Sequence, residues 1–91
     1  MAKIQIPSIP ATIIAGDTGD NIIQFPNAFP AVGLVAKITV ISGTFKFNNI
    51  GNASLSNVSY TADESVLLTI MQGYDLSYIA NSGADTFRIE I

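Results

Sequence analysis

The sequence predicts an all-β fold, a small β-sandwich or jelly-roll-like domain of seven to eight short antiparallel strands. One observation is strict alternation over short runs, as in Ala84–Ile91, where Phe87 and Ile89 alternate with Arg88 and Glu90. A second is that Gly, Pro, Asn and Ser punctuate these runs at short intervals. A third is that no longer segment shows the helical period of about 3.6 residues. Together they favour a two-sheet sandwich.

All of these strands are expected to belong to a single domain, residues 1–91. Pro7 and Pro10 bound its beginning, and proline cannot donate to a β ladder. Residues 1–10 are therefore expected to form an edge strand or an extended N-terminal arm. The remaining strands are expected at Ala11–Ala15, Asn21–Phe25, Ala36–Ile41, Thr44–Asn48, Val66–Met71, Leu76–Ala80 and Ala84–Ile91.

The stretch Ala36–Asn48 contains two β-like runs whose alternation changes phase at Ser42-Gly43. A two-residue hairpin explains this change by pairing Val40 with Phe45, which gathers the apolar side chains on one face. A β-bulge at Gly43 in one long strand explains it equally well, although we favour the hairpin. In the hairpin the opposite, outer face carries Lys37, Thr39 and Lys46, which are the first candidate interaction residues.

The run Val66–Met71 is apolar on both faces of a strand. A central strand buried on two sides has this pattern. The alternative is a strand that is buried once by its own core and once by a partner. The sequence leaves both interpretations open.

Charged residues are scarce. They make up 12% of the chain, against about 25% in a typical soluble domain. Charges normally keep strand edges unpaired, so we infer that another protein covers part of the surface, rather than that the chain is a monomer with a polar surface. The four basic residues, Lys3, Lys37, Lys46 and Arg88, are scattered in a chain of net charge −3. Neither nucleic acid nor an anionic membrane is an expected partner.

Catalytic and metal-binding chemistry is poorly represented. The chain has no histidine and no cysteine, which excludes Ser–His and Cys–His pairs and ordinary zinc sites. Asp17 and Asp20 lie in a glycine-rich turn without the glutamate of a calcium loop. Asp63-Glu64 is interpreted as a solvated turn rather than a carboxylate pair. We expect no enzymatic activity, no metal and no cofactor.

Three tyrosines suggest an alternative function. Aromatic side chains on a β module can stack on sugars, so a carbohydrate-binding module is the competing hypothesis. Tyr78 alternates with Leu76 and Ala80 and is expected to face the core. Tyr60 and Tyr74 flank loops and are the candidate interaction residues for this alternative.

The C-terminal part carries a recognisable order of motifs. First comes a strand that ends in Ser-Gly-Thr, followed by a second apolar strand (ITVISGTFKFN). A tight turn then leads into an aliphatic strand (YTADESVLLTI). An aromatic-aliphatic strand, a Ser-Gly turn and an alternating terminal strand complete the order (LSYIANSGADTFRIEI). From Lys37 to Ile91 this resembles a family of small β-sandwich modules common in virion proteins of tailed bacteriophages. The family pattern often has glycine where this chain has Asp63, and Met1–Leu34 has no counterpart in it.

The resemblance implies a structural role, as an auxiliary or decoration protein of the phage head or as a small fibre or tail component. It implies partners of two kinds: further copies of the chain, such as a trimer, and a major capsid or other virion protein. It also implies location in the virion after synthesis in the host cytoplasm. The N-terminus agrees, since MAKIQIPSIP lacks the apolar core of a signal peptide.

Overall fold

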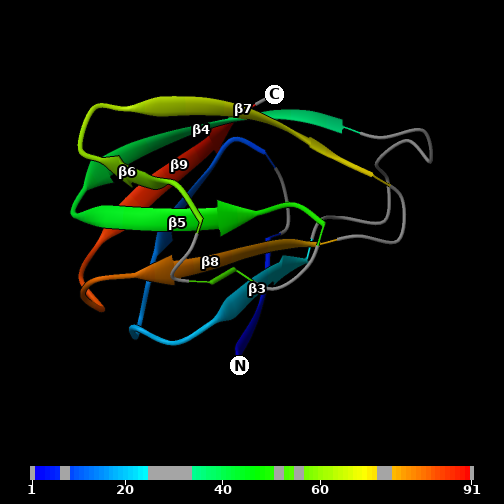
Figure 1. Cartoon of the computed structure of the whole chain (residues 1–91). Helices are drawn as coiled ribbons and strands as arrows, with labels where there is room; N and C mark the ends of the chain where they lie inside the picture. The colour runs from blue at the N-terminus through cyan, green and yellow to red at the C-terminus, as the bar shows by residue number, and fades with distance from the viewer. Residues whose placement is uncertain are drawn as a thin grey trace.

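The computed structural model describes residues 2–6, 9–24, 34–50, 53–54, 57–71 and 75–90, with only the backbone for residues 2, 3 and 34. Two sheets pack face to face, and no helix occurs among these residues (Figure 1). The predicted all-β sandwich is therefore confirmed. The strands are β1 (Ala2–Gln5), β2 (Ala11–Ile14), β3 (Asn21–Gln24), β4 (Leu34–Ser42), β5 (Thr44–Asn48), β6 (Ser59–Thr61), β7 (Ser65–Ile70), β8 (Leu76–Ala80) and β9 (Thr86–Glu90).

The described residues thus hold nine strands rather than seven to eight. Strand β6 was missed because its three residues, Ser59–Thr61, are too short to show alternation. The other strands lie within a few residues of their predicted positions. Their alternation and their flanking turn residues were sufficient to place them.

The order of strands is that of a jelly roll. Sheet A has the order β1-β3-β8-β5-β6, and sheet B has the order β2-β9-β4-β7. Strands β2 to β5 pair antiparallel with strands β9 to β6 in reverse sequence, so that β5·β6 is the innermost pair and β2·β9 the outermost. Closing β4 on β9 and β5 on β8 rolls this ribbon into two sheets. Strand β1 joins the edge of sheet A, parallel to β3.

The core lies between the sheets and is centred on four aromatic rings. Phe45 and Phe47 come from sheet A, and Phe87 from sheet B meets them edge-on at ring-centroid distances of 4.8 and 5.1 Å. Tyr78 completes the cluster at 5.2 Å from Phe87 and is fully buried, as its alternation predicted. Edge-to-face contacts at these distances are the favoured geometry for aromatic rings.

The phase change at Ser42-Gly43 is not a hairpin. It is also not a bulge within one long strand, although β4 has a bulge-like register shift against β9 between Val40 and Ser42. Strand β4 pairs with β7 and β9 in sheet B, whereas β5 pairs with β6 and β8 in sheet A. The predicted pairing of Val40 with Phe45 is therefore wrong. The chain crosses from one sheet to the other here, and the register shift between Val40 and Ser42 in the pairing with β9 adds the extra residue that changes the phase. Residue Gly43 makes the corner with a φ of +80°, a value that favours glycine.

Asp85 joins this corner to the turn between β8 and β9. Its carboxylate accepts hydrogen bonds from the backbone N–H groups of Asn81, Ser82 and Thr44 at 3.1, 3.0 and 3.4 Å. It also fills the space where a side chain on Gly43 would lie. The two turns that connect the sheets on this side are therefore held by one buried carboxylate.

Strand β7 lies at the edge of sheet B, beyond β4. The interpretation of Val66–Met71 as a central strand is wrong. Ile70 is buried and Val66 and Leu68 are half-buried, but Leu67 on the outer face is 67% exposed. Leu67, which lies between Ser65 and Thr69 on the outer row of this strand, therefore has no cover from the described residues.

Candidate functional site

The outer face of sheet B is the main candidate for an interaction surface. It carries large aliphatic side chains that other described residues leave exposed: Ile14 on β2, Val35 on β4 and Leu67 on β7, at 64%, 54% and 67%. Exposed aliphatic side chains that share one face are candidates for contact with another protein. We define the sheet B face as Ile14, Val35, Lys37, Thr39, Leu67, Arg88 and Glu90.

The polar part of the sheet B face lies at its centre. Arg88 and Glu90, two residues apart on β9, form an ion pair with 3.5 Å between Nε and Oε1. In the register of the sheet, Lys37 on β4 lies between Glu90 on β9 and Leu67 on β7. A small charged group is thus flanked by aliphatic residues.

A hydroxyl pair adjoins this charged group. Thr39 Oγ1 and Ser65 Oγ lie 3.0 Å apart, on neighbouring positions of β4 and β7. Such a contact across an antiparallel pair holds two exposed side chains in place. Apolar side chains therefore meet solvent on the two edge strands of the sheet B face, at Ile14 on β2 and Leu67 on β7.

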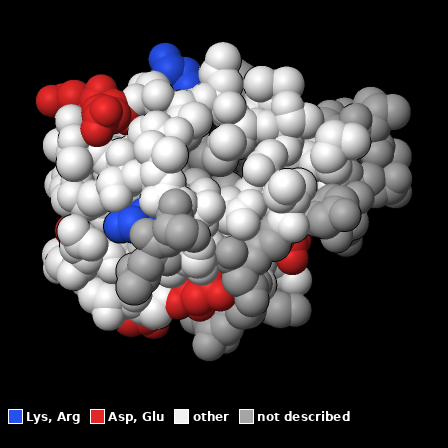
Figure 2. Space-filling view, in the orientation of Figure 1, with Lys and Arg blue, Asp and Glu red and all other residues white. Residues whose placement is uncertain are grey.

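The outer face of sheet A differs because the chain's own loop reaches over it. The backbone N–H of Ala53 donates to Ser77 Oγ at 2.8 Å, and this hydroxyl donates to Asp20 Oδ1 at 2.5 Å. Ser77 is buried although it points away from the core. Figure 2 shows this side of the molecule with few charged residues, set well apart among uncharged ones.

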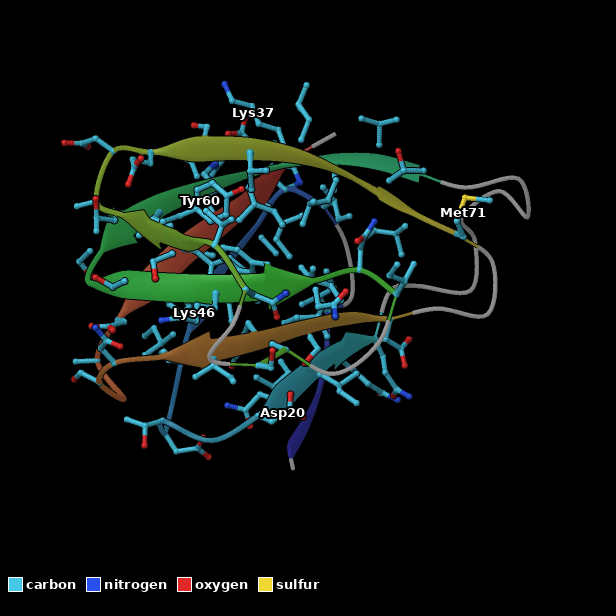
Figure 3. The ribbon with its side chains drawn as sticks, viewed as in Figure 1. Asp20, Lys37, Lys46, Tyr60 and Met71 are labelled. Carbon is cyan, nitrogen blue, oxygen red and sulfur yellow. The ribbon has the colours of Figure 1, made fainter. Side chains whose placement is uncertain are left out.

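The candidate residues Lys37, Thr39 and Lys46 do not share a face. Lys37 and Thr39 lie on the outer face of sheet B, whereas Lys46 lies on that of sheet A, beside Ile79 and Ser59 in the register (Figure 3). The prediction fails because it assumed a hairpin. Once the chain crosses between sheets at Gly43, the outward residues on either side of the corner belong to opposite sides of the sandwich.

The tyrosines do not form an exposed aromatic platform among the described residues. Tyr60 on β6 is half-buried, and its ring centroid lies 6.2 Å from that of Phe47 (Figure 3). Tyr78 is in the core and donates a hydrogen bond to the carbonyl of Ala15 at 3.0 Å. Burial, assisted by the charge of Asp17, raises its pKa to about 12. Tyr74 lies outside the described residues.

The carboxylates that were considered for chemistry have local structural roles. Asp17 Oδ1 accepts from the N–H of Gly19 and the amide of Asn21, both at 2.9 Å, as in an Asx turn. Glu64 accepts from the hydroxyl and backbone N–H of Thr61, both at 2.7 Å, and these bonds lower the pKa of its carboxyl group. No cluster of three or more acidic, histidine or cysteine residues suited to a metal occurs in the described ranges.

Asp63 marks the turn between β6 and β7. Its φ of +71° lies in the left-handed region, which asparagine, aspartate and above all glycine adopt. The turn therefore has a backbone conformation that glycine adopts readily and that aspartate tolerates.

Sequence reasoning missed Arg88 and the aliphatic members of the sheet B face. Arg88 alternates with Phe87 and Ile89, so its outward direction was readable. Its position beside Thr39 was not, because that depends on the pairing of β4 with β9. The exposed Ile14 resembles a core residue in sequence.

The chain has no match among known protein families, curated proteins or solved structures. None of the described segments forms a helix able to cross a membrane.

Proposed function

We propose that the chain is a non-enzymatic structural protein of a tailed-phage virion, an auxiliary or decoration protein that docks on the capsid as an oligomer through the sheet B face. The observation that carries this proposal is the exposure of Ile14, Val35 and Leu67 on one face of a chain with 12% charged residues. Aliphatic side chains on one face and few charges elsewhere favour contact with another protein.

The expected strength of docking follows from the size of these side chains. Full burial of one aliphatic side chain contributes about 1.5–3 kcal/mol. Ile14, Val35 and Leu67 are already partly buried, so a single copy gains only a few kcal/mol from covering them. The loss of translational and rotational freedom offsets much of this gain. Stable attachment therefore requires several linked copies, which a repeating capsid surface provides.

The charges on the sheet B face indicate the kind of surface that it fits. Lys37 and Arg88 contribute +2 and Glu90 contributes −1, so the face carries +1 in a chain of net charge −3. Two of the chain's four basic residues are thus gathered here. The complementary partner is an acidic patch of a capsid protein, flanked by apolar residues.

The topology supports the proposal only in part. Jelly rolls form viral capsid domains, but they also form lectins. A fold of this kind does not determine a function. The choice between the two rests on the surface, because Tyr60 packs on Phe47 rather than standing free for a sugar. No described residue offers a specific reason to prefer the carbohydrate-binding alternative.

The test uses two matched charge reversals on opposite sides of the sandwich. Lys37→Glu changes the sheet B face, and Lys46→Glu makes the same change on sheet A. We expect Lys37→Glu to reduce the number of copies in purified particles by about tenfold or more, which corresponds to a loss of about 1.4 kcal/mol or more. Lys46→Glu should be incorporated as the wild type is. Quantitative mass spectrometry of the particles measures both.

Two results would contradict the proposal. Absence of the wild-type protein from purified particles removes the virion role altogether. Equal incorporation of Lys37→Glu and Lys46→Glu removes the sheet B face as the docking surface. Thermal unfolding of both variants provides the control. Lys37→Glu sets a carboxylate opposite Glu90, so both variants should stay within about 1 kcal/mol of the wild type in stability.

A further inference from the structure

We propose that the open edge of β7 is a self-pairing site, where a second copy adds its own β7 antiparallel about a two-fold axis at Leu67. The juxtaposition of two β7 edges would join two copies of sheet B into one continuous sheet. This inference rests on the oligomeric part of the proposed function and names the contact that forms the oligomer. Its basis is the hydrogen-bonding register of β7 and the chemistry of its two rows of side chains.

The edge of β7 differs from the other three sheet edges. Proteins protect edge strands by keeping them short, by placing charges or proline on them, or by covering them. Strand β1 carries Lys3 and is followed by Pro7, and β2 follows Pro10. Strand β6 has three residues, and Glu64 occupies the N–H of Thr61. Strand β7 has six residues, the sequence SVLLTI, without charge or proline.

The direction of the backbone groups of β7 follows from two hydrogen bonds. Val40 N–H donates to the carbonyl of Glu64 at 2.9 Å, so the even-numbered residues of this strand bond to β4. The carbonyl of Thr69 accepts from Asn49 Nδ2 at 2.6 Å, on the side away from β4. Both place the N–H and C=O groups of Ser65, Leu67 and Thr69 on the open edge. The groups of Leu67 have no partner among the described residues, where β7 pairs with β4 alone.

A second copy fits this edge because every side chain would meet one of similar chemistry. With Leu67 opposite Leu67 of the second copy, Ser65 lies opposite Thr69 and Val66 lies opposite Leu68. Hydroxyl would face hydroxyl and aliphatic would face aliphatic, on both faces of the sheet. Val66 and Leu68 are only half-buried within one chain, so the pairing also covers the apolar surface that they leave open.

This register agrees with the charges around β7. Glu64 would lie opposite Ile70 of the second copy, so the two Glu64 carboxylates stand at opposite ends of the paired strands, about 20 Å apart along them. Lys37 lies one strand further in, on β4. No like charges are therefore brought together at the edge.

The two neighbouring self-pairing registers are less suitable. Centring the axis on Val66 would set Ser65 opposite Leu67 and Glu64 opposite Leu68, so polar groups would face aliphatic ones. Centring the axis on Leu68 would set Leu67 opposite Thr69, whose carbonyl already accepts from Asn49. Both central Leu67–Thr69 pairs would then compete with Asn49 for the carbonyl of Thr69. Centring the axis on Leu67 uses two residues whose backbone groups are open, so this register makes its central bonds without displacement. It meets the Asn49 bond only at the flanking Ser65–Thr69 pairs.

The contact should be weak in solution. A six-residue strand spans about 20 Å and buries well under the roughly 800 Å² per partner of a standard interface. We therefore expect a dimer that forms with rising concentration rather than a permanent one. On a capsid, docking through the sheet B face would raise the local concentration and favour the same pairing.

The first experiment uses single cysteines, since the wild-type chain has none. In the proposed register the two Leu67 Cα atoms are about 5.5 Å apart, within the range of a disulfide. The two Thr69 Cα atoms are about 14 Å apart along the strand, beyond that range. Mild oxidation should therefore link Leu67→Cys into dimers and leave Thr69→Cys, on the same row of the same strand, essentially unlinked. Equal linking of both variants, or of neither, would overturn the register.

The second experiment measures amide hydrogen exchange of the unmodified chain at low and high concentration. The amides of Ser65 and Leu67 should become protected as concentration rises, whereas the amide of Leu68, bonded to β4, should be protected throughout. The variant Leu67→Lys sets two like charges opposite each other and should weaken dimerisation about tenfold or more. The matched variant Ile14→Lys, at a similarly exposed position on β2, should leave it unchanged.

Two outcomes overturn the proposal: exchange at Leu67 that is independent of concentration, and a trimer by native mass measurement, which a single two-fold contact cannot close. Both measurements use purified chain without particles. Their failure would leave docking through the sheet B face intact, and absence of the chain from particles would leave the dimer intact.

Discussion

The two outer faces of the sandwich differ in what covers them. On sheet A, the N–H of Ala53 reaches Ser77, and this contact buries a polar residue that points away from the core. On sheet B, Val35 and Leu67 are more than half exposed, and the described residues leave them uncovered. Residues that point away from the core are therefore buried on sheet A at Ser77 but exposed on sheet B at Val35 and Leu67. One face is partly covered by the chain itself, and the other is not covered by the described residues.

The difference depends on the corner at Gly43, which assigns β4 and β5 to different sheets. A side chain at Gly43 would overlap the carboxylate of Asp85, and the φ of +80° is costly for any other residue. We expect Gly43→Ala to lower the free energy of unfolding by about 3 kcal/mol or more, the largest effect predicted here. Denaturant unfolding followed by circular dichroism measures this.

Gly19→Ala is the matched control for the corner. A Cβ at Gly19 would meet Asp17 Oδ1 at 3.4 Å, an ordinary contact. We expect a change within about 1 kcal/mol. Wild-type stability in Gly43→Ala would show that the crossing between sheets does not need a left-handed residue.

Ser77→Ala should loosen the contact by which the loop at Ala53 covers the outer face of sheet A. It removes the acceptor of the Ala53 N–H and the donor to Asp20. We expect a loss of about 1–2 kcal/mol of stability and faster amide exchange at Ala53. Thr39→Ala deletes a comparable hydroxyl from the sheet B face, where its bond to Ser65 is exposed, and should cost no more than about 0.5 kcal/mol. Equal losses in both variants would contradict the difference between the faces.

Tyr78 contributes a pH-dependent link between the sheets, because its hydroxyl on β8 bonds Ala15, which follows β2. Its pKa is raised to about 12 by burial and then by Asp17. An unfolded tyrosine titrates near about 10. Below that pH the hydroxyl is protonated in both states, so its contribution to stability is fully present. Between these pKa values only the unfolded chain loses the proton, and the contribution is lost as pH rises.

Tyr78→Phe tests this pH dependence, which begins only above about pH 10. Stability of the wild type should fall more steeply than that of the variant as pH rises above about 10. The comparison is made by denaturant unfolding at a series of alkaline pH values. Parallel slopes would show that another group, and not Tyr78, governs alkaline unfolding.

The positions of strands were predictable because alternation and turn residues are local signals. Leu76–Ala80 was predicted with the bounds that β8 has. The partner of each strand was not predictable from the same signals. A phase change such as that at Gly43 arises in a hairpin, in a bulge and in a crossing between sheets, and only the pairings of β4 and β5 distinguish the three.

The candidate site was affected by this ambiguity. Lys46 was assigned to the face of Lys37 because the hairpin required it, and Arg88 was overlooked because its neighbour on β4 was unknown. Val66–Met71 was ambiguous for a different reason. A strand that is apolar on both faces has the same sequence whether its second face is covered within the chain or by another chain.

The nested pairing of strands has a consequence for chain entropy. The outermost pair, β2·β9, joins residues from opposite ends of the sequence. Once β3·β8 is in place, however, only residues 15–20 and 81–85 remain to be closed for β2·β9 to form. Closure entropy depends on the length of the loop that is still free, so each long-range pair costs little more than a short one. A jelly roll of 91 residues can thereby hold its two ends together without a single disulfide.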